Sequence, residues 1–150
     1  MADVVSKATR SRMMSGIRTS KTKPELQVRA LLRGCGYRRS YDVKSLPGRP
    51  DIVIHSKEIA IFVHGCFWHR HGCQIFKWPN TRPLFWRKKL ELNRRRDQRV
   101  YADLAARGWR VMVIWQCALS DSSDERPQMA TRLTKWVASA ARFTVIHGRR

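Results

Sequence analysis

The run Trp109–Trp115 is nearly unbroken in apolar residues, and it constrains the fold more than any other part of the chain. A short apolar run of this kind is typical of a strand that is covered on both faces, at the centre of a layered sheet. Two further β-rich runs, Asp51–His55 and Ile59–Val63, are joined by a short polar link and therefore predict a hairpin. These three runs together predict a small sheet.

Helical patterns surround the predicted strands. Thr22 and Glu25 have the spacing of a capping box, which predicts a helix that begins there and ends before Gly34. A long, strongly cationic helix is expected over Arg82–Arg107, and a last helix is expected near Met129–Ala140. The order helix, hairpin, helix, central strand, helix indicates an α/β domain in which helices flank a small mixed sheet.

The composition favours a basic, single-domain protein. The chain has 150 residues, and its 31 Lys and Arg against 11 Asp and Glu give a formal net charge of +20. A polyanion is therefore the expected partner. No apolar run approaches the roughly 20 residues of a membrane-spanning helix, and no secretory signal is recognisable, so we expect a cytoplasmic location, at the nucleoid. Residues 1–20 are expected to form a basic arm or a short helix that orders on a ligand.

The segment Val63–Cys73 concentrates histidine, cysteine and large aromatic residues. Cys66, His71 and Cys73 offer three zinc ligands at short range, and Cys117, which follows the predicted central strand, is a candidate for the fourth. A site with four protein ligands is closed and hence structural. The alternative reading is that the cysteines are buried thiols. The other candidates for the fourth ligand are Cys35 and His69.

An acidic residue at a strand entrance indicates where a catalytic metal could bind. Asp51 precedes one predicted strand and His64 ends the next, an arrangement similar to the core of metal-dependent nucleases. Those enzymes usually carry a second acidic residue and a lysine on the second strand, where this chain has Phe62 and His64. Mg²⁺ would then be held by Asp51, a backbone carbonyl such as that of Val63, phosphate oxygens and water.

Other side chains suit the remaining steps of phosphodiester hydrolysis. His64 can stabilise charge on the phosphate, and His69 can take a proton from the attacking water, because its ordinary pKa of about 6.5 is close to neutral pH. Asp97 is a candidate to orient that base, and Glu25 a candidate to hold a water molecule of the metal shell. The alternative for Glu25 is a capping role alone.

Two segments carry a family resemblance. Ser45–Asp51 followed by Phe62–His69 resembles the very short patch repair (Vsr) DNA mismatch endonucleases, and the match continues to about Leu119. The resemblance implies a restriction-endonuclease-like fold. It also implies an enzyme that nicks duplex DNA on the 5′ side of the thymine in a T:G mismatch left by deamination of 5-methylcytosine, after which a short patch is resynthesised.

The resemblance also implies residue roles. Asp51 and the carbonyl of Val63 become the Mg²⁺ ligands, His69 the general base and His64 its partner at the phosphate. The resemblance selects Cys117 over Cys35 as the fourth zinc ligand. Val63 is not a hydroxyl residue, which matters little if only its carbonyl binds the metal. The residues matching those that enter the base stack or face the mismatched pair are Phe67, Trp68, Trp86, Met14, Lys89 and Asn93. The match of Met14 implies that the basic arm of residues 1–20 orders on DNA.

Two other functions compete with this interpretation. A restriction-type endonuclease would cut both strands of paired DNA, but Phe62 in place of the second carboxylate argues against it. A non-catalytic zinc module would bind DNA without cutting it and would tolerate loss of Asp51. A monomer and an association with mismatch-repair proteins are expected from the resemblance alone.

Overall fold

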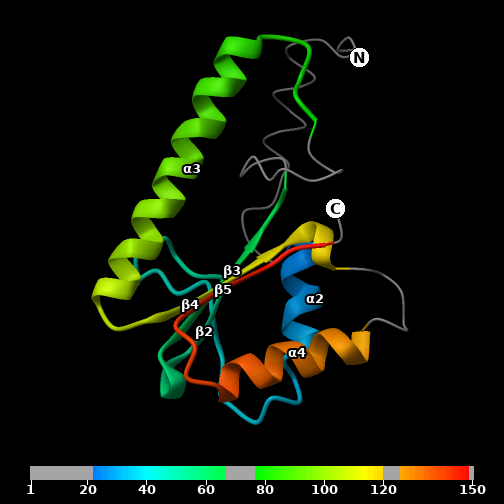
Figure 1. The fold of residues 1–150 in the computed structure, drawn as a ribbon, viewed down its shortest axis with the longest axis vertical. Coiled ribbons are helices and arrows are strands. Elements are labelled where there is room, and N and C mark those ends of the chain that lie inside the picture. The colour runs from blue at the N-terminus through cyan, green and yellow to red at the C-terminus, as the bar shows by residue number, and fades with distance from the viewer. Residues whose placement is uncertain (1–21, 67–76, 120–125, 149–150) are drawn as a thin grey trace.

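A mixed five-stranded sheet forms the centre of the computed structural model, which describes residues 22–66, 77–119 and 126–148 (Figure 1). The spatial order of the strands follows the chain. The first three strands are antiparallel neighbours, and the last two pairings are parallel. The strands are β1 (Ser40–Tyr41), β2 (Ile52–Ile54), β3 (Ile59–His64), β4 (Arg110–Trp115) and β5 (Phe143–Ile146).

Helices cover both faces of the sheet. Helix α3 (Pro83–Ala106) lies on one side, and α2 (Lys23–Leu31) and α4 (Arg126–Ala138) lie on the other (Figure 1). Successive strand residues point to opposite faces, so the two faces build separate apolar clusters. Ile59 and Ile61 pack in the cluster that includes residues of α2 and α4, whereas Ala60 and Phe62 pack in the cluster that includes Leu104 of α3. The predicted α/β class is confirmed.

The predicted elements are present with small shifts in their ends. Thr22 is the N-cap of α2, and its hydroxyl oxygen accepts a hydrogen bond from the backbone N–H of Glu25 at 3.4 Å. The predicted hairpin is the antiparallel pair β2–β3, and the predicted central strand is β4, which pairs on both sides. Helix α4 begins at Arg126, earlier than expected, because Pro127 is tolerated in a first helical turn, where its missing N–H costs nothing.

Two edge strands, β1 and β5, were not predicted from the sequence. Strand β1 has only two residues, too few to show any periodicity. Strand β5 lies parallel to β4, and α4 makes the crossover between them. None of the helices in the described ranges is long and apolar enough to span a membrane.

The loop that leads into β2 is held against α3 by a glycine. Gly48 has a φ of +72°, a conformation that side-chain-bearing residues rarely adopt. A Cβ added there would overlap the side chain of Val100 on α3. The close approach of the loop to α3 therefore requires glycine, and it sets where Pro50 and Asp51 enter the sheet.

Candidate functional site

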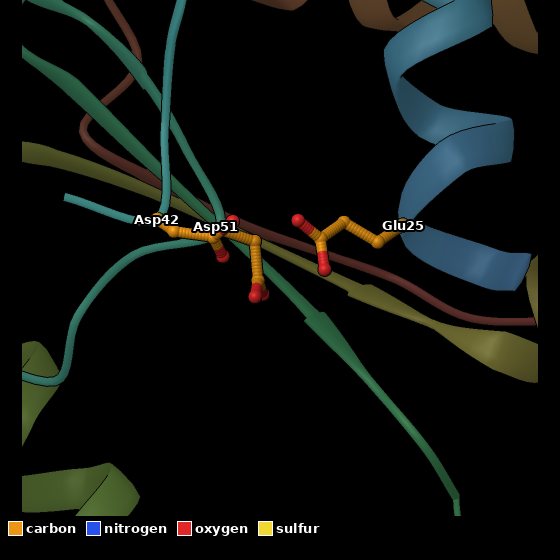
Figure 2. A group of neighbouring side chains, drawn as sticks. All are labelled: Glu25, Asp42 and Asp51. Atoms are coloured by element: carbon orange, nitrogen blue, oxygen red, sulfur yellow. The ribbon is translucent and has the colours of Figure 1, made fainter. Parts of the chain in front are cut away.

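Three carboxylates from three separate parts of the chain meet at one end of the sheet. Glu25 comes from the first turn of α2, Asp42 follows β1, and Asp51 precedes β2. One carboxylate oxygen from each lies within 4.8 Å of the others, and Figure 2 shows Glu25 extending from its helix toward the two aspartates. Among the predicted site residues, Glu25 and Asp51 are thus brought together.

Asp42 is a member of this cluster that the sequence did not reveal. The antiparallel register pairs Tyr41 with Ile52, and one position further along Asp42 lies beside Asp51. There the backbone N–H of Asp42 donates to the carbonyl of Asp51 at 3.1 Å. Asp42 has a φ of 49°, a left-handed conformation that aspartate adopts more readily than most residues. Only knowledge of the two-residue strand β1 would have indicated in advance that Asp42 lies beside Asp51.

The carboxylate of Asp51 is largely enclosed. Its Oδ2 accepts a hydrogen bond of 2.7 Å from the backbone N–H of Val63 on β3. Burial is the main cause that raises the pKa of Asp51 to about 7, and the negative charges of Glu25 and Asp42 contribute to the increase. The Val63 hydrogen bond and the Arg29 charge oppose it. A carboxylate that resists ionisation beside two others gains from a bound cation, which favours its charged form.

Arg29 links the other two carboxylates. Its Nη2 donates to Oε1 of Glu25 at 2.7 Å and to Oδ2 of Asp42 at 3.4 Å. The guanidinium also lies over the ring of Tyr41, 3.9 Å from its centroid. Because Glu25 is only 2% exposed, its charge needs such a partner. Arg29 therefore stabilises two negative charges beside Asp51.

The oxygen donors of this cluster fit a hard divalent cation. Mg²⁺ is bound in proteins by one or two carboxylates, with water or substrate phosphate completing the shell. Soft metals prefer sulfur and nitrogen, and the cluster offers neither. Asp51 is the residue best placed to hold such an ion, with Glu25 and Asp42 beside it. The predicted role of the Val63 carbonyl stays a prediction, because the described contact of Val63 with Asp51 is through its N–H.

His64 ends β3, and its ring is enclosed by aromatic side chains. It is 6% exposed, and its ring centroid lies 5.8 Å from that of Phe62 and 5.3 Å from that of Trp115. Its Nε2 lies 2.5 Å from the hydroxyl oxygen of Tyr101 on α3. Tyr101 was not among the predicted site residues, because nothing in a helical sequence pattern shows which strand end a tyrosine reaches.

Asp97 lies on α3, one turn before Tyr101 and outside the three-carboxylate cluster. Burial raises the pKa of Tyr101, and the negative charges of Asp97 and Asp51 act in the same direction. Asp97 is therefore electrostatically close to the group that contacts His64. The predicted general base, His69, lies outside the described residues, so the predicted pairing of Asp97 with it stays a prediction.

The parallel pairing of β3 and β4 puts one cysteine just beyond the C-terminal end of each of these neighbouring strands. The register pairs His64 with Trp115, and Cys66 and Cys117 each follow two residues later. Cys66 is buried, and Sγ of Cys117 accepts a hydrogen bond of 3.4 Å from the backbone N–H of Gly148. Cys35, the alternative ligand, packs in the cluster on the α2 face. The remaining predicted zinc ligands, His71 and Cys73, lie outside the described residues.

The described residues that are predicted to contact DNA all lie on α3. Lys89 and Asn93 are partly exposed and four residues apart on α3, so they are neighbours on the helix surface. Trp86 is 7% exposed, so stacking on a base would require it to be uncovered, whereas the adjacent Phe85 is 41% exposed. The predicted DNA-contacting residues Met14, Phe67 and Trp68 lie outside the described residues.

Known DNA-cleaving enzymes are similar to the chain over most of its length. The family model described as DNA mismatch endonuclease Vsr matches residues 2–75. The type II nicking enzyme V.XorIIP of Xanthomonas oryzae is 52% identical over 121 residues, which are 81% of this chain and 89% of that protein. The DNA mismatch endonuclease Vsr of Escherichia coli is 44% identical over 138 residues, 91% of this chain and 88% of its own. The type II nicking enzyme V.NmeAIP of Neisseria meningitidis is 34% identical over 140 residues, 93% of this chain and 99% of its own.

These relationships establish the class of the protein, which is a DNA endonuclease. The chain belongs to the Vsr family of DNA mismatch endonucleases. The non-catalytic zinc module is thereby set aside as an account of the whole chain.

Proposed function

We propose that this endonuclease uses Mg²⁺ to nick one strand of duplex DNA, on the 5′ side of the T in T:G mismatches that arise from deamination of 5-methylcytosine, and so initiates very short patch repair. The observation that carries the proposal is the enclosed Asp51 carboxylate, held by Val63 and flanked by Glu25 and Asp42. Its raised pKa marks a charge that a cation would stabilise.

Each proposed site residue has a distinct role. Asp51 and the Val63 carbonyl hold Mg²⁺, which when bound offsets negative charge on the scissile phosphate. Glu25 positions a water molecule beside it, and Asp42 is added to the predicted set as a neighbouring acceptor. His64 stabilises charge at the phosphate. His69 takes the proton of the attacking water as the phosphodiester P–O bond breaks, and Asp97 orients His69.

DNA binding is assigned mainly to α3 and to the segment after β3. Cations on α3 such as Arg94 and Arg95 contact phosphates, which fixes the position of the duplex without reading its sequence. Lys89 and Asn93, with Met14, face the mismatched pair. Phe67, Trp68 and Trp86 enter the base stack, a step that a mismatch makes less costly because its stacking and pairing are already weakened.

A structural zinc ion is proposed to hold the segment after β3. Its ligands are Cys66, His71, Cys73 and Cys117. The position of Cys66 and Cys117 beyond the ends of two neighbouring strands supports the site, since thiolates are typical zinc ligands. The mixed sheet with helices on both faces supports the proposed restriction-endonuclease-like fold.

The cellular setting follows from the proposed reaction. An enzyme that repairs deaminated bacterial DNA acts in the cytoplasm, at the nucleoid. We propose that it acts as a monomer, because one site that cuts one strand needs no second copy. Mismatch-repair proteins are the expected partners.

Cleavage of matched duplexes tests the proposed specificity. End-labelled duplexes that differ only in one base pair, T:G, C:G or T:A within a CTWGG context, are incubated with the enzyme and Mg²⁺. We expect a single nick 5′ of the mismatched T and no cut in either paired duplex. Cutting of paired DNA would replace the proposal with the restriction-type activity, and binding without cutting in several sequence contexts would contradict it.

A further inference from the structure

The hydroxyl group of Tyr101 makes a contact that is not required for the packing of its ring. The ring packs against Phe62, with the two centroids 5.5 Å apart, and against Phe143, with the centroids 5.9 Å apart. A phenylalanine would fill the same space. The hydroxyl oxygen adds one polar contact, at 2.5 Å from Nε2 of His64. The contact joins α3 to the end of β3, where the candidate site lies.

The direction of this hydrogen bond depends on which nitrogen of His64 carries the ring proton. Burial raises the pKa of Tyr101 above its ordinary value, so the phenol keeps its proton at neutral pH. A protonated phenol can donate to an unprotonated ring nitrogen or accept from a protonated one, and a neutral imidazole has one nitrogen of each kind. If Nε2 of His64 accepts from Tyr101, the ring proton is on Nδ1. The hydrogen bond at one nitrogen thereby sets the protonation of the other.

The surroundings of His64 leave its ring little freedom. Phe62 and Trp115 lie close to it on the sheet, and Tyr101 lies close to it on α3. The Tyr101 contact at Nε2 therefore helps to hold the ring in one orientation at the end of β3.

We propose that Tyr101 is a positioning residue for DNA cleavage: its hydroxyl donates to Nε2 of His64 and thereby holds that ring in one orientation and one tautomer at the end of β3. The inference rests on the proposed function, because it assigns His64 to the phosphate. It adds a residue of α3 to the site and explains how that helix, which also carries Lys89 and Asn93, is coupled to the end of β3.

Tyr101→Phe removes the hydroxyl and keeps the aromatic packing. Histidine-nitrogen NMR spectra of the isotope-labelled enzyme, with His64 assigned from a His64→Gln variant, report which ring nitrogen carries the proton. In the unsubstituted enzyme we expect an unprotonated Nε2 and a protonated Nδ1. In Tyr101→Phe we expect the Nε2-protonated form, which predominates in free histidine, to appear.

Kinetics connect this change to the reaction. We expect Tyr101→Phe to lower the single-turnover nicking rate roughly tenfold, the equivalent of one lost hydrogen bond, with DNA affinity changed less than about twofold. Tyr37→Phe is the matched control. Tyr37 packs beside the cluster on the opposite face of the sheet, so its substitution should leave both the His64 signals and the rate unchanged.

The outcomes separate this inference from the proposed function. His64 signals that are identical in the unsubstituted and Tyr101→Phe enzymes would overturn the inference, and so would altered signals with an unchanged rate. Equal rate losses in Tyr101→Phe and Tyr37→Phe would also overturn it, because they would indicate general destabilisation. If the unsubstituted enzyme leaves T:G duplexes uncut, the proposed function fails, while the spectra still decide whether Tyr101 sets the protonation of His64.

Discussion

The carboxyl group of Asp51 titrates near neutral pH, because burial raises its pKa to about 7. The folded chain therefore keeps a proton on Asp51 that the unfolded chain has already released above its ordinary pKa of 3.8. The unfolded state binds fewer protons across this window, so the contribution of Asp51 to the free energy of unfolding decreases as pH rises from about 4 to about 7. Cation binding, which needs the ionised form, improves over the same interval.

This titration predicts how Mg²⁺ and pH act together. At limiting Mg²⁺ the nicking rate should rise with pH and level off above about pH 7, and higher Mg²⁺ should move the midpoint to lower pH because the cation competes with the proton. The measurement is a series of pH–rate profiles at several Mg²⁺ concentrations. A midpoint that does not move with Mg²⁺ would assign the titration to another group, such as His69.

Asp42→Asn tests whether the additional carboxylate belongs to the site. Asparagine tolerates the left-handed backbone at this position, so the substitution removes charge with little strain. Because the charge of Asp42 raises the pKa of Asp51, the midpoint of the low-Mg²⁺ profile should shift to lower pH. Asp103→Asn is the control, since Asp103 pairs with Arg107 on the exposed end of α3. Identical profiles for Asp42→Asn and the unsubstituted enzyme would exclude Asp42 from the site.

At the scale of single residues, the sequence indicated candidate site residues that lie at the ends of predicted strands and helices. Asp51 precedes a strand, His64 ends one, and Glu25 begins a helix, so local patterns revealed all three. Asp42 and Tyr101 reach the site through tertiary pairing, of a two-residue strand and of a long helix, and local patterns carry no record of such pairing.

The loop between β1 and β2 depends on its contact with α3. Gly48→Ala should lower the free energy of unfolding by roughly 2 kcal/mol or more, because the new Cβ meets Val100 and the left-handed φ disfavours alanine. Gly34→Ala is the control: no described atom approaches that position within 4 Å, and its effect should stay within about 0.5–1 kcal/mol. Chemical denaturation measures both. Equal stability of the two variants would show that the loop moves freely.

The ends of β3 and β4 should share one zinc ion. Cys66→Ala and Cys117→Ala are expected to lose bound zinc, because each removes a thiolate from a four-ligand site, and to unfold at lower temperature. Cys35→Ala should keep its zinc, since the thiol of Cys35 donates to the carbonyl of Tyr37 within the apolar cluster. Metal analysis of the purified variants decides the matter. Zinc retained in Cys117→Ala and lost in Cys35→Ala would make Cys35 the ligand.

Helices and strands that are long enough to show a hydrophobic periodicity or a helix-capping pattern could be predicted from the sequence. Helix α3 and strand β4 are clear in this sense, and their ends differ from the expected ones by a residue. Strands β1 and β5 depend on pairing with neighbours that are already in place. Edge strands of two and four residues gain their order from the sheet, so their own residues carry little signal.

The net positive charge of the whole molecule affects how it binds DNA. A net charge of +20 draws the protein to any duplex, so affinity for DNA alone says little about its function. Specific action must come from the site at the end of the sheet, where a cluster of negative charge stands in a basic protein. We therefore expect catalysis to depend on the three-carboxylate cluster. General DNA binding should not depend on it.

The most direct test compares Mg²⁺-dependent nicking of a T:G duplex by the unsubstituted enzyme, Asp51→Asn and the control Asp103→Asn, with DNA affinity measured alongside. We predict a nick 5′ of the mismatched T by the unsubstituted enzyme and by Asp103→Asn, and a rate reduced roughly 100-fold or more in Asp51→Asn at unchanged affinity. Nicking by Asp51→Asn at the unsubstituted rate would contradict the account, because the reaction would then not depend on the carboxylate around which the site is built.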